Sequence, residues 1–119
     1  MSFEDTIVAL DWMPKGWVQS FVPQLKQELR ETVGIYADDF EIIQAKEKYG
    51  ALRICWAWRE REYTEHEIKR INILSDYVEE VITKYEYISM NICMNCGNEN
   101  TKLRQILCDE CYKNLQKDK

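Results

Sequence analysis

Two Cys-x-x-Cys pairs near the end of the chain constrain its fold more than any other feature. The first pair is Cys93 and Cys96, the second is Cys108 and Cys111, and 11 residues separate them. One such turn directs two thiolates at the same ion, and two turns complete the tetrahedral shell of structural zinc. The sequence therefore predicts a zinc site with these four ligands, and it leaves iron open as the alternative metal.

A redox function explains these cysteines less well. A thioredoxin-type site needs a single pair at the start of a helix within a βαβ unit, and that context is missing here. Four thiolates also fill the shell of the ion, so no position remains for an activated water. We expect a structural metal, whose binding contributes about 10–16 kcal/mol to the folding of a short segment.

The segment 90–119 has the pattern of a small metal finger. Gly97 follows the first pair and suits the left-handed conformation that such turns often need. Around the second pair, the apolar Ile106 and Leu107 predict a short strand before the cysteines, and a short helix is expected after them. This order is that of zinc-ribbon or treble-clef fingers, and we expect the finger to pack as one unit with residues 1–89.

Residues 1–89 predict an α+β body in the order helix, β-hairpin, long helix. Residues 1–14 are expected to be irregular. Between residues 16 and 33, apolar side chains fall within an arc of about 120° on a helical wheel, which predicts the first helix. They are Val18, Phe21, Val22, Leu25, Leu29 and Val33. Because Pro23 is tolerated only in a first turn, Ser20 is the expected N-cap, and Gly34 is the expected end.

Residues 40–58 are rich in β-branched and aromatic side chains around Tyr49-Gly50, which predicts a hairpin with strands 40–48 and 51–58. A two-residue turn gives one largely apolar face, which pairs Ala45 with Ile54, Ile43 with Trp56, and Glu47 with Leu52. The opposite face then carries Gln44, Lys46, Arg53, Cys55 and Ala57. A slip of one residue would exchange the two faces.

A capping box at Thr64-Glu65-His66-Glu67 predicts the start of the long helix. Apolar side chains then keep helical spacing for about six turns, over an arc of about 160°. They are Ile68, Ile71, Leu74, Val78, Val81, Ile82, Tyr85 and Ile88. Such a wide arc indicates packing against both the hairpin and the first helix, and the acidic opposite side is expected to face solvent.

The charge and the termini limit the classes of function. The formal net charge is −5 over 119 residues, which disfavours non-specific attraction to nucleic acid or anionic lipid. The N-terminus lacks the features of a signal peptide, and no stretch approaches the ~20 apolar residues of a membrane helix. We expect a cytoplasmic protein of one domain that does not bind membranes.

No catalytic constellation stands out. His66 is the only histidine and falls in the first turn of the long helix, and Cys55 is expected to be a small buried side chain. The carboxylates are scattered, as in Asp38-Asp39 and Glu79-Glu80. We therefore expect a non-enzyme, and a hydrolase or nuclease would need a second, open metal site.

Two groups of residues are candidates for a partner surface. The first is a basic ribbon on the polar face of the hairpin, where Lys46 and Arg53 are expected to lie opposite each other beside Lys48, Arg59 and Arg61. Neutralisation by nearby glutamates or by a neighbouring helix is the alternative. The second is a set of anchors outside the predicted core, namely Trp58, Ile73, Tyr77 and Tyr87. Ordinary surface aromatics are the alternative there.

The hairpin segment Lys46-Glu47-Lys48-Tyr49-Gly50-Ala51-Leu52-Arg53-Ile54 resembles the K-E-K-[FY]-G-G-L-R-F segment of small uncharacterised proteins of bacteriophages and prophages. Those proteins also tend to carry a Gly-Trp pair near the start, to which Gly16-Trp17 is similar. They also tend to carry a later C-x-x-C-G segment, to which Cys93-Met94-Asn95-Cys96-Gly97 is similar. The chain departs from them at Ala51 and at Ile54-Cys55. The resemblance implies a phage or mobile-element accessory protein in a bacterial host, and it implies no activity.

Together these features predict a non-enzymatic, zinc-stabilised binding protein that acts on a host or phage protein, as an inhibitor or modulator of host defence. The alternative is a nucleic-acid-binding or transcription-regulating finger that uses Lys102, Arg104 and Lys113 with the basic ribbon. The oligomeric state is left open.

Overall fold

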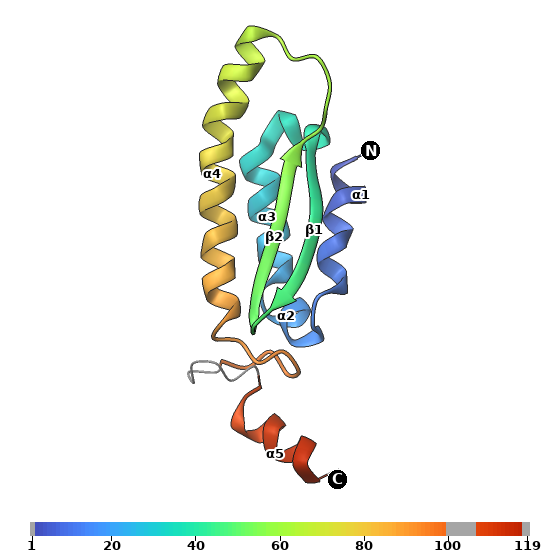
Figure 1. The fold of residues 1–119 in the computed structure, drawn as a ribbon, viewed down its shortest axis with the longest axis vertical. Coiled ribbons are helices and arrows are strands. Elements are labelled where there is room, and N and C mark those ends of the chain that lie inside the picture. Colours follow the sequence, from blue (N-terminus) through green and yellow to red (C-terminus); the bar gives the residue numbers. More distant parts are fainter. Residues whose placement is uncertain (1, 100–106, 118–119) are drawn as a thin grey trace.

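Residues 2–99 and 107–117 are described by a computed structural model. The elements are α1 (Phe3–Ile7), the 3-10 helix η1 (Val8–Trp12), α2 (Lys15–Ser20), α3 (Val22–Val33), the 3-10 helix η2 (Gly34–Asp39), β1 (Phe40–Lys48), β2 (Ala51–Trp58), α4 (Glu65–Ser89) and α5 (Asp109–Lys117). The hairpin lies between α1 and α4 with α3 behind it, and α5 lies beyond the C-terminal end of α4 (Figure 1). The predicted α+β class and the order helix, hairpin, long helix, cysteine cluster are confirmed.

The N-terminal segment is helical, so the expectation of an irregular stretch at residues 1–14 is wrong. Ser2 and Asp5 form a capping box, in which the Asp5 amide donates to Ser2 Oγ at 3.3 Å and the Ser2 amide donates to Asp5 Oδ2 at 3.1 Å. Phe3, Ile7 and Leu10 are buried in the core. Five residues are too few to display a helical period, so this helix depends on tertiary packing.

The predicted first helix is divided into α2 and α3 at Phe21, whose backbone leaves the helical region at φ −129°. Pro23 has no N–H, so an uninterrupted helix would lose a hydrogen bond there, and instead it occupies the first turn of α3. Ser20 ends α2 and is not the N-cap that we expected. Gly34 ends α3 as predicted, with a positive φ of 53°.

The hairpin strands have the predicted bounds, and β1 pairs with β2 in the predicted register from Lys48 back to Gln44. The expected pairing of Ile43 with Trp56 is wrong, because a bulge between Ile42 and Gln44 shifts the ladder by one residue. Ile42 therefore faces Trp56, and the Ile43 side chain is 60% exposed. A bulge lets the apolar start of β1 return to the core face after the polar residues near the turn.

Both edges of this two-stranded sheet are covered by helices. Thr6 Oγ1 of α1 accepts a hydrogen bond from the Ile42 amide at 2.7 Å. On the other edge, Ser89 Oγ of α4 accepts one from the Leu52 amide at 2.8 Å. A hairpin alone is only marginally stable in water, so these contacts and the shared core explain how it persists.

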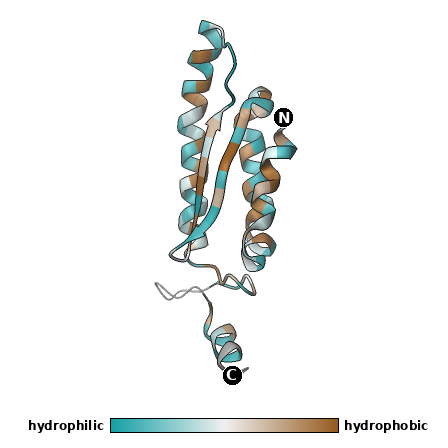
Figure 2. Ribbon diagram, turned by 45° about the vertical axis from the view of Figure 1, so that its right-hand side comes forward, coloured by the Kyte–Doolittle hydropathy of each residue, from teal (hydrophilic) through white to brown (hydrophobic). Residues whose placement is uncertain are grey.

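The long helix α4 begins at the predicted capping box, in which the Glu67 amide donates to Thr64 Oγ1 at 3.1 Å. It packs against both α3 and β2, as its wide apolar arc predicted. Only Ile68 of that arc points largely to solvent, because it lies in the first turn. Hydrophobic residues gather on the inward sides of the helices and strands, whereas the β2–α4 loop is hydrophilic (Figure 2). None of the helices within the described residues is long and apolar enough to span a membrane.

Candidate metal centre

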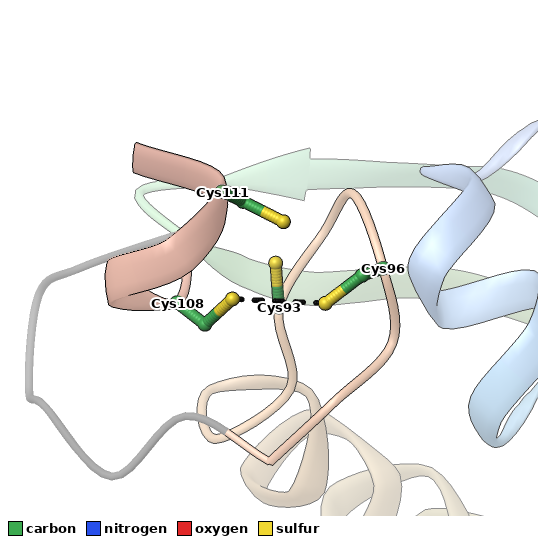
Figure 3. A group of neighbouring side chains, drawn as sticks. All are labelled: Cys93, Cys96, Cys108 and Cys111. Atoms are coloured by element: carbon green, nitrogen blue, oxygen red, sulfur yellow. Dashed lines mark hydrogen bonds between the residues drawn. The ribbon is translucent and has the colours of Figure 1, made fainter. Parts of the chain in front are cut away.

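The four predicted ligands converge on one point (Figure 3). All four Sγ atoms lie within 4.8 Å of one another, and the Sγ atoms of Cys96 and Cys108 are 3.7 Å apart. A tetrahedral zinc ion with Zn–S bonds of ~2.3 Å requires S···S separations of about 3.8 Å. The donor set therefore fits a zinc ion, which Cys93, Cys96, Cys108 and Cys111 would hold as thiolates.

The first turn is held by backbone hydrogen bonds around Cys93. The Gly97 amide donates to the Cys93 carbonyl at 3.0 Å, and the Cys93 amide donates to the Asn98 carbonyl at 2.8 Å. Gly97 has a φ of 80°, the left-handed conformation that the sequence predicted. Cys93 is fully buried, whereas Cys96 is half-buried.

The second turn supplies its cysteines from the start of a helix. Cys108 precedes α5 and Cys111 lies in its first turn, so the helix predicted after the second pair is confirmed. Asn95 connects the two turns, because its Nδ2 donates to Cys111 Sγ at 3.3 Å. The strand predicted ahead of the pair begins at Ile106, outside the described residues.

The first turn rests directly on the body. The Gly16 amide donates to the Met94 carbonyl at 2.8 Å, and Trp17 Nε1 donates to the Ile92 carbonyl at 3.2 Å. A Cβ atom on Gly16 would lie 2.2 Å from the Cys93 carbonyl oxygen, a distance that no side chain tolerates. Sequence reasoning found no such role for Gly16, since nothing local indicates that another segment passes so close.

The surroundings of the two cysteines in the first turn shift their pKa values in opposite directions. Burial raises the pKa of Cys93, but hydrogen bonds from the backbone amides of Cys108, Cys96 and Asn95 outweigh it and lower this pKa to about 6. The Asn98 amide lowers the pKa of Cys96, yet burial and the adjacent thiols raise it to about 12. A divalent cation would relieve the repulsion among four thiolates and allow all of them to ionise.

The predicted basic ribbon is only partly present. Lys46, Lys48 and Arg53 share the outward face of the hairpin near its turn, and Lys46 lies opposite Arg53 as expected. Arg61 points elsewhere, because its Nε and Nη2 donate to the Asp39 carboxylate at 2.8 and 2.9 Å. Arg59 Nη2 also lies 3.4 Å from this carboxylate. The importance of Asp39, a buried carboxylate between two arginines, was missed by the sequence reasoning.

The predicted anchors fall into two classes. Ile73, Tyr77 and Tyr87 are exposed along α4, at 60, 56 and 67%. Trp58 is half-buried instead, because its indole packs edge-on against Trp56 and its Nε1 donates to Ser75 Oγ at 2.8 Å.

Other placements also differ from expectation. Cys55 is exposed rather than buried, since it lies on the outward face of the hairpin. His66 lines a shallow groove between η2 and α4. Lys113 is exposed on α5, whereas Lys102 and Arg104 lie outside the described residues.

An exposed residue that sequence reasoning overlooked is Tyr49, at the tip of the hairpin. Its side chain is 92% exposed and its backbone has a positive φ of 56°. The signal was available, because a two-residue hairpin turn of this type needs positive φ at both central positions.

In comparisons with known proteins, no family model, no curated protein and no solved structure matches this chain. The resemblance of the hairpin segment to phage proteins therefore stays a prediction.

Proposed function

We propose that this chain is a non-enzymatic, zinc-stabilised binding protein that recognises an acidic surface on a protein partner through the tip of its hairpin. Four thiolates complete a zinc shell, which supports a structural role for the metal. Hydrogen bonds from Gly16 and Trp17 hold the first cysteine turn at the same end of the body as the hairpin tip (Figure 1), and the metal would join the second turn to it. The rigid scaffold would thus lie next to the recognition surface.

The observation that carries this proposal is the conformation of Tyr49. A left-handed backbone costs a residue with a side chain about 1–2 kcal/mol, and Asn or Gly is the usual occupant of such a turn position. The Tyr49 ring is almost fully exposed, so burial against the body does not offset this cost. The Lys48 ammonium lies 5.7 Å from the centroid of the Tyr49 ring. Backbone strain at an exposed aromatic is typical of a binding anchor.

Three basic side chains, Lys46, Lys48 and Arg53, lie near this anchor, together with the Glu47 carboxylate, which accepts a hydrogen bond from the Gly50 amide at 2.7 Å. Lys46 and Arg53 lie directly across from each other, an arrangement that destabilises a hairpin by itself. Arg53 Nη1 lies 3.9 Å from the Glu86 carboxylate, and both side chains are partly exposed. A partner with acidic side chains would relieve this repulsion and would gain specificity from the complementary charge.

A hollow of about 260 Å³ adjoins the charged face. Its lining includes Arg53 and Tyr87, two residues that the sequence predicted for a partner surface. It is lined by Arg53 of β2 and by Thr83, Glu86, Tyr87 and Met90 at the end of α4. Tyr87 and Met90 are exposed, at 67 and 40%. An apolar side chain of the partner would fit between them while its carboxylates meet Arg53.

The resemblance of the hairpin segment to phage proteins supports a more specific biological setting. In this setting the protein acts in the bacterial cytoplasm and binds a host or phage protein, as an inhibitor or modulator of host defence.

Capture of a partner by the tagged, zinc-loaded chain from host cells, followed by mass spectrometry, tests this proposal. We expect one stoichiometric protein, captured by the unmodified chain and lost with Tyr49→Asn. This variant should be at least as stable as the original, because Asn tolerates the left-handed turn better than Tyr. Ile35→Ala is the matched control, since Ile35 is 88% exposed near the opposite end of the body and should leave capture unchanged.

Two outcomes would contradict the proposal. Equal capture by Tyr49→Asn and by the unmodified chain would remove the hairpin tip from the interface. Retention on DNA or RNA that weakens steeply with salt, without a protein partner, would favour the nucleic-acid alternative.

A further inference from the structure

The outward side of α4 carries a row of exposed residues that the proposed function does not use. Arg70, Ile73, Tyr77 and Glu80 follow one another at spacings of three, four and three residues, so they form one stripe on the helix. All four are exposed, and the stripe lies opposite the buried side that carries Val78 and Ile82. Alternate spacings of three and four are those of a helix–helix seam.

Charge is distributed unevenly along this side of the helix. Lys69 and Arg70 lie before the apolar pair Ile73 and Tyr77, whereas Asp76 and Glu80 lie within or after it. Within residues 2–99 and 107–117, none of these four charged side chains has an ion pair or a side-chain hydrogen bond. The basic and acidic ends of the stripe are therefore both available to another molecule.

The adjacent charges on α4 are already engaged within the body. Glu79 accepts a hydrogen bond from Trp56 Nε1 at 2.6 Å, and Lys84 Nζ lies 2.5 Å from Glu28. Among the described residues, Arg70 and Glu80 of the stripe and Lys69 and Asp76 beside it have no such partner.

We propose that the occupant of this stripe is a second copy of the chain, packed with its α4 antiparallel across a two-fold axis level with Ser75. In this arrangement Arg70 faces Glu80 of the second copy, and Ile73 faces Tyr77 of the second copy. The two-fold axis generates each contact twice. A parallel arrangement would place Arg70 against Arg70 and Glu80 against Glu80, so the charges specify the antiparallel one.

A groove beside the stripe offers a place for the tyrosine. It has a volume of about 550 Å³, and Ile35 of η2 and Arg70, Ile73 and Leu74 of α4 contribute to its lining. With the axis at Ser75, Tyr77 of the second copy lies at the level of Ile73, at the side of this groove. Tyrosine in an apolar socket rimmed by an arginine is a common centre of binding energy in interfaces.

The seam is independent of the hairpin tip, so its test is separate from that of the proposed function. The zinc-loaded chain is studied by sedimentation velocity over a wide concentration range at low ionic strength. We expect a concentration-dependent shift from one chain of 14.3 kDa to twice that mass. Added salt should favour the monomer, because it screens the exposed pairs.

Charge exchange identifies the seam. Arg70→Glu and Glu80→Arg should each raise the dimer dissociation constant by about tenfold or more, because each places like charges together twice. The double variant Arg70→Glu/Glu80→Arg restores opposite charges and should return the constant to within about threefold of the original. Tyr77→Ala should weaken the dimer as well, whereas Tyr49→Asn should not. Unchanged thermal unfolding verifies that each variant retains its fold.

A chain that sediments at 14.3 kDa throughout the concentration range would overturn the proposal. A dimer that is insensitive to Arg70→Glu, or that the charge exchange does not restore, would place the interface elsewhere.

Discussion

The body and the cysteine tail are stabilised by different physical means. Among the described residues, every buried apolar side chain except Cys93 belongs to residues 3–85. The body thus folds around a core that includes Trp17, Leu25 and Phe40, all almost completely inaccessible to solvent. The tail has too few apolar residues for a core of its own, and its four converging cysteines form a site that fits a metal ion. A bound metal would replace burial where the chain is too short to bury enough surface.

The two regions meet at the first cysteine turn. Gly16 and Trp17 bind its backbone, and Ile92 and Met94 pack against the core of the body. Among the described residues, α5 does not pack extensively against any other element. We therefore expect the body to survive without the metal, and the tail to depend on it. The following changes test this comparison, beginning with the largest expected effect.

Removal of the metal should unfold the tail and leave the body folded. Cys108→Ser, or a strong chelator, removes a folding contribution of about 10–16 kcal/mol from a segment without a core. In amide NMR spectra, signals of residues 107–114 should collapse to unfolded positions while those of Leu25, Leu52 and Val78 persist. Metal analysis of the untreated protein should give one zinc per chain. Loss of the body signals together with those of the tail would show that the two regions are a single folding unit.

A cavity in the core should have the reverse effect. Leu25 is completely buried in α3, so Leu25→Ala should lower the free energy of unfolding of the body by about 3 kcal/mol. Zinc affinity should remain unchanged at temperatures where the variant is folded, because Leu25 belongs to the core cluster and the buried ligand Cys93 does not. Competition with a chromogenic chelator measures the affinity, and denaturant unfolding measures the stability. A large decrease in zinc affinity would indicate that the core and the metal centre are strongly coupled.

A methyl group at the contact between the regions should affect both. Gly16→Ala inserts a Cβ atom against the Cys93 carbonyl oxygen, so the first cysteine turn must move. This movement should lower the free energy of unfolding by about 1–3 kcal/mol and weaken zinc binding. Gly34→Ala is the matched control. Its Cβ atom would have no neighbour within 4 Å, so this variant should show only the cost of a positive φ, with zinc affinity unchanged.

Acid should destabilise the body through the loop that joins β2 to α4. Hydrogen bonds from Arg61 hold the pKa of Asp39 below its ordinary value of 3.8, and they lower the pKa of Glu67 to about 2 from 4.5. Because the folded-state pKa values are depressed, this stabilisation is complete above about pH 4.5 and decreases as the pH falls toward 2.

Asp39→Asn should lower the free energy of unfolding of the body by about 1–2 kcal/mol at neutral pH. The partial exposure of the two arginine partners keeps this loss small. It should also flatten the acid dependence measured by body signals in NMR. These signals separate the effect from protonation of the zinc ligands. An acid profile identical to that of the unmodified chain would contradict this role of Asp39.

The smallest change concerns the outward face of the hairpin. Lys46→Glu replaces a like-charge pair with an opposite one across from Arg53, and it should raise the free energy of unfolding by about 0.5 kcal/mol. Denaturant unfolding at low ionic strength measures the gain, which should shrink in salt. A decrease in stability would show that Lys46 has a stabilising contact within the body.

The elements predicted best are those whose signal is local. The capping box at Thr64 and the alternation around Tyr49-Gly50 each depend on residues close in sequence. The first gives the observed start of the long helix, and the second gives the observed bounds of the hairpin strands. The spacing of the cysteines likewise indicates a single tetrahedral site. Local signals of this kind survive in the folded chain because the tertiary structure does not oppose them.

The elements that escaped prediction depend on distant neighbours. Helix α1 is too short to show a helical period in its apolar residues. The bulge at Ile43 appears only because β1 must fit both the turn and the core. Cys55 was expected inside because cysteine is often buried, but the register places it on the open face.

The sequence by itself determined the four-cysteine cluster, the hairpin turn and the amphipathic helix that covers one edge, since each is encoded in the spacing of nearby residues. Only the tertiary structure decided that Gly16 supports the first cysteine turn and that Asp39 engages the arginines. The physical reason is distance along the chain. A contact such as that between Gly16 and Cys93 is set by the packing of the whole body, and no local pattern of residues records it.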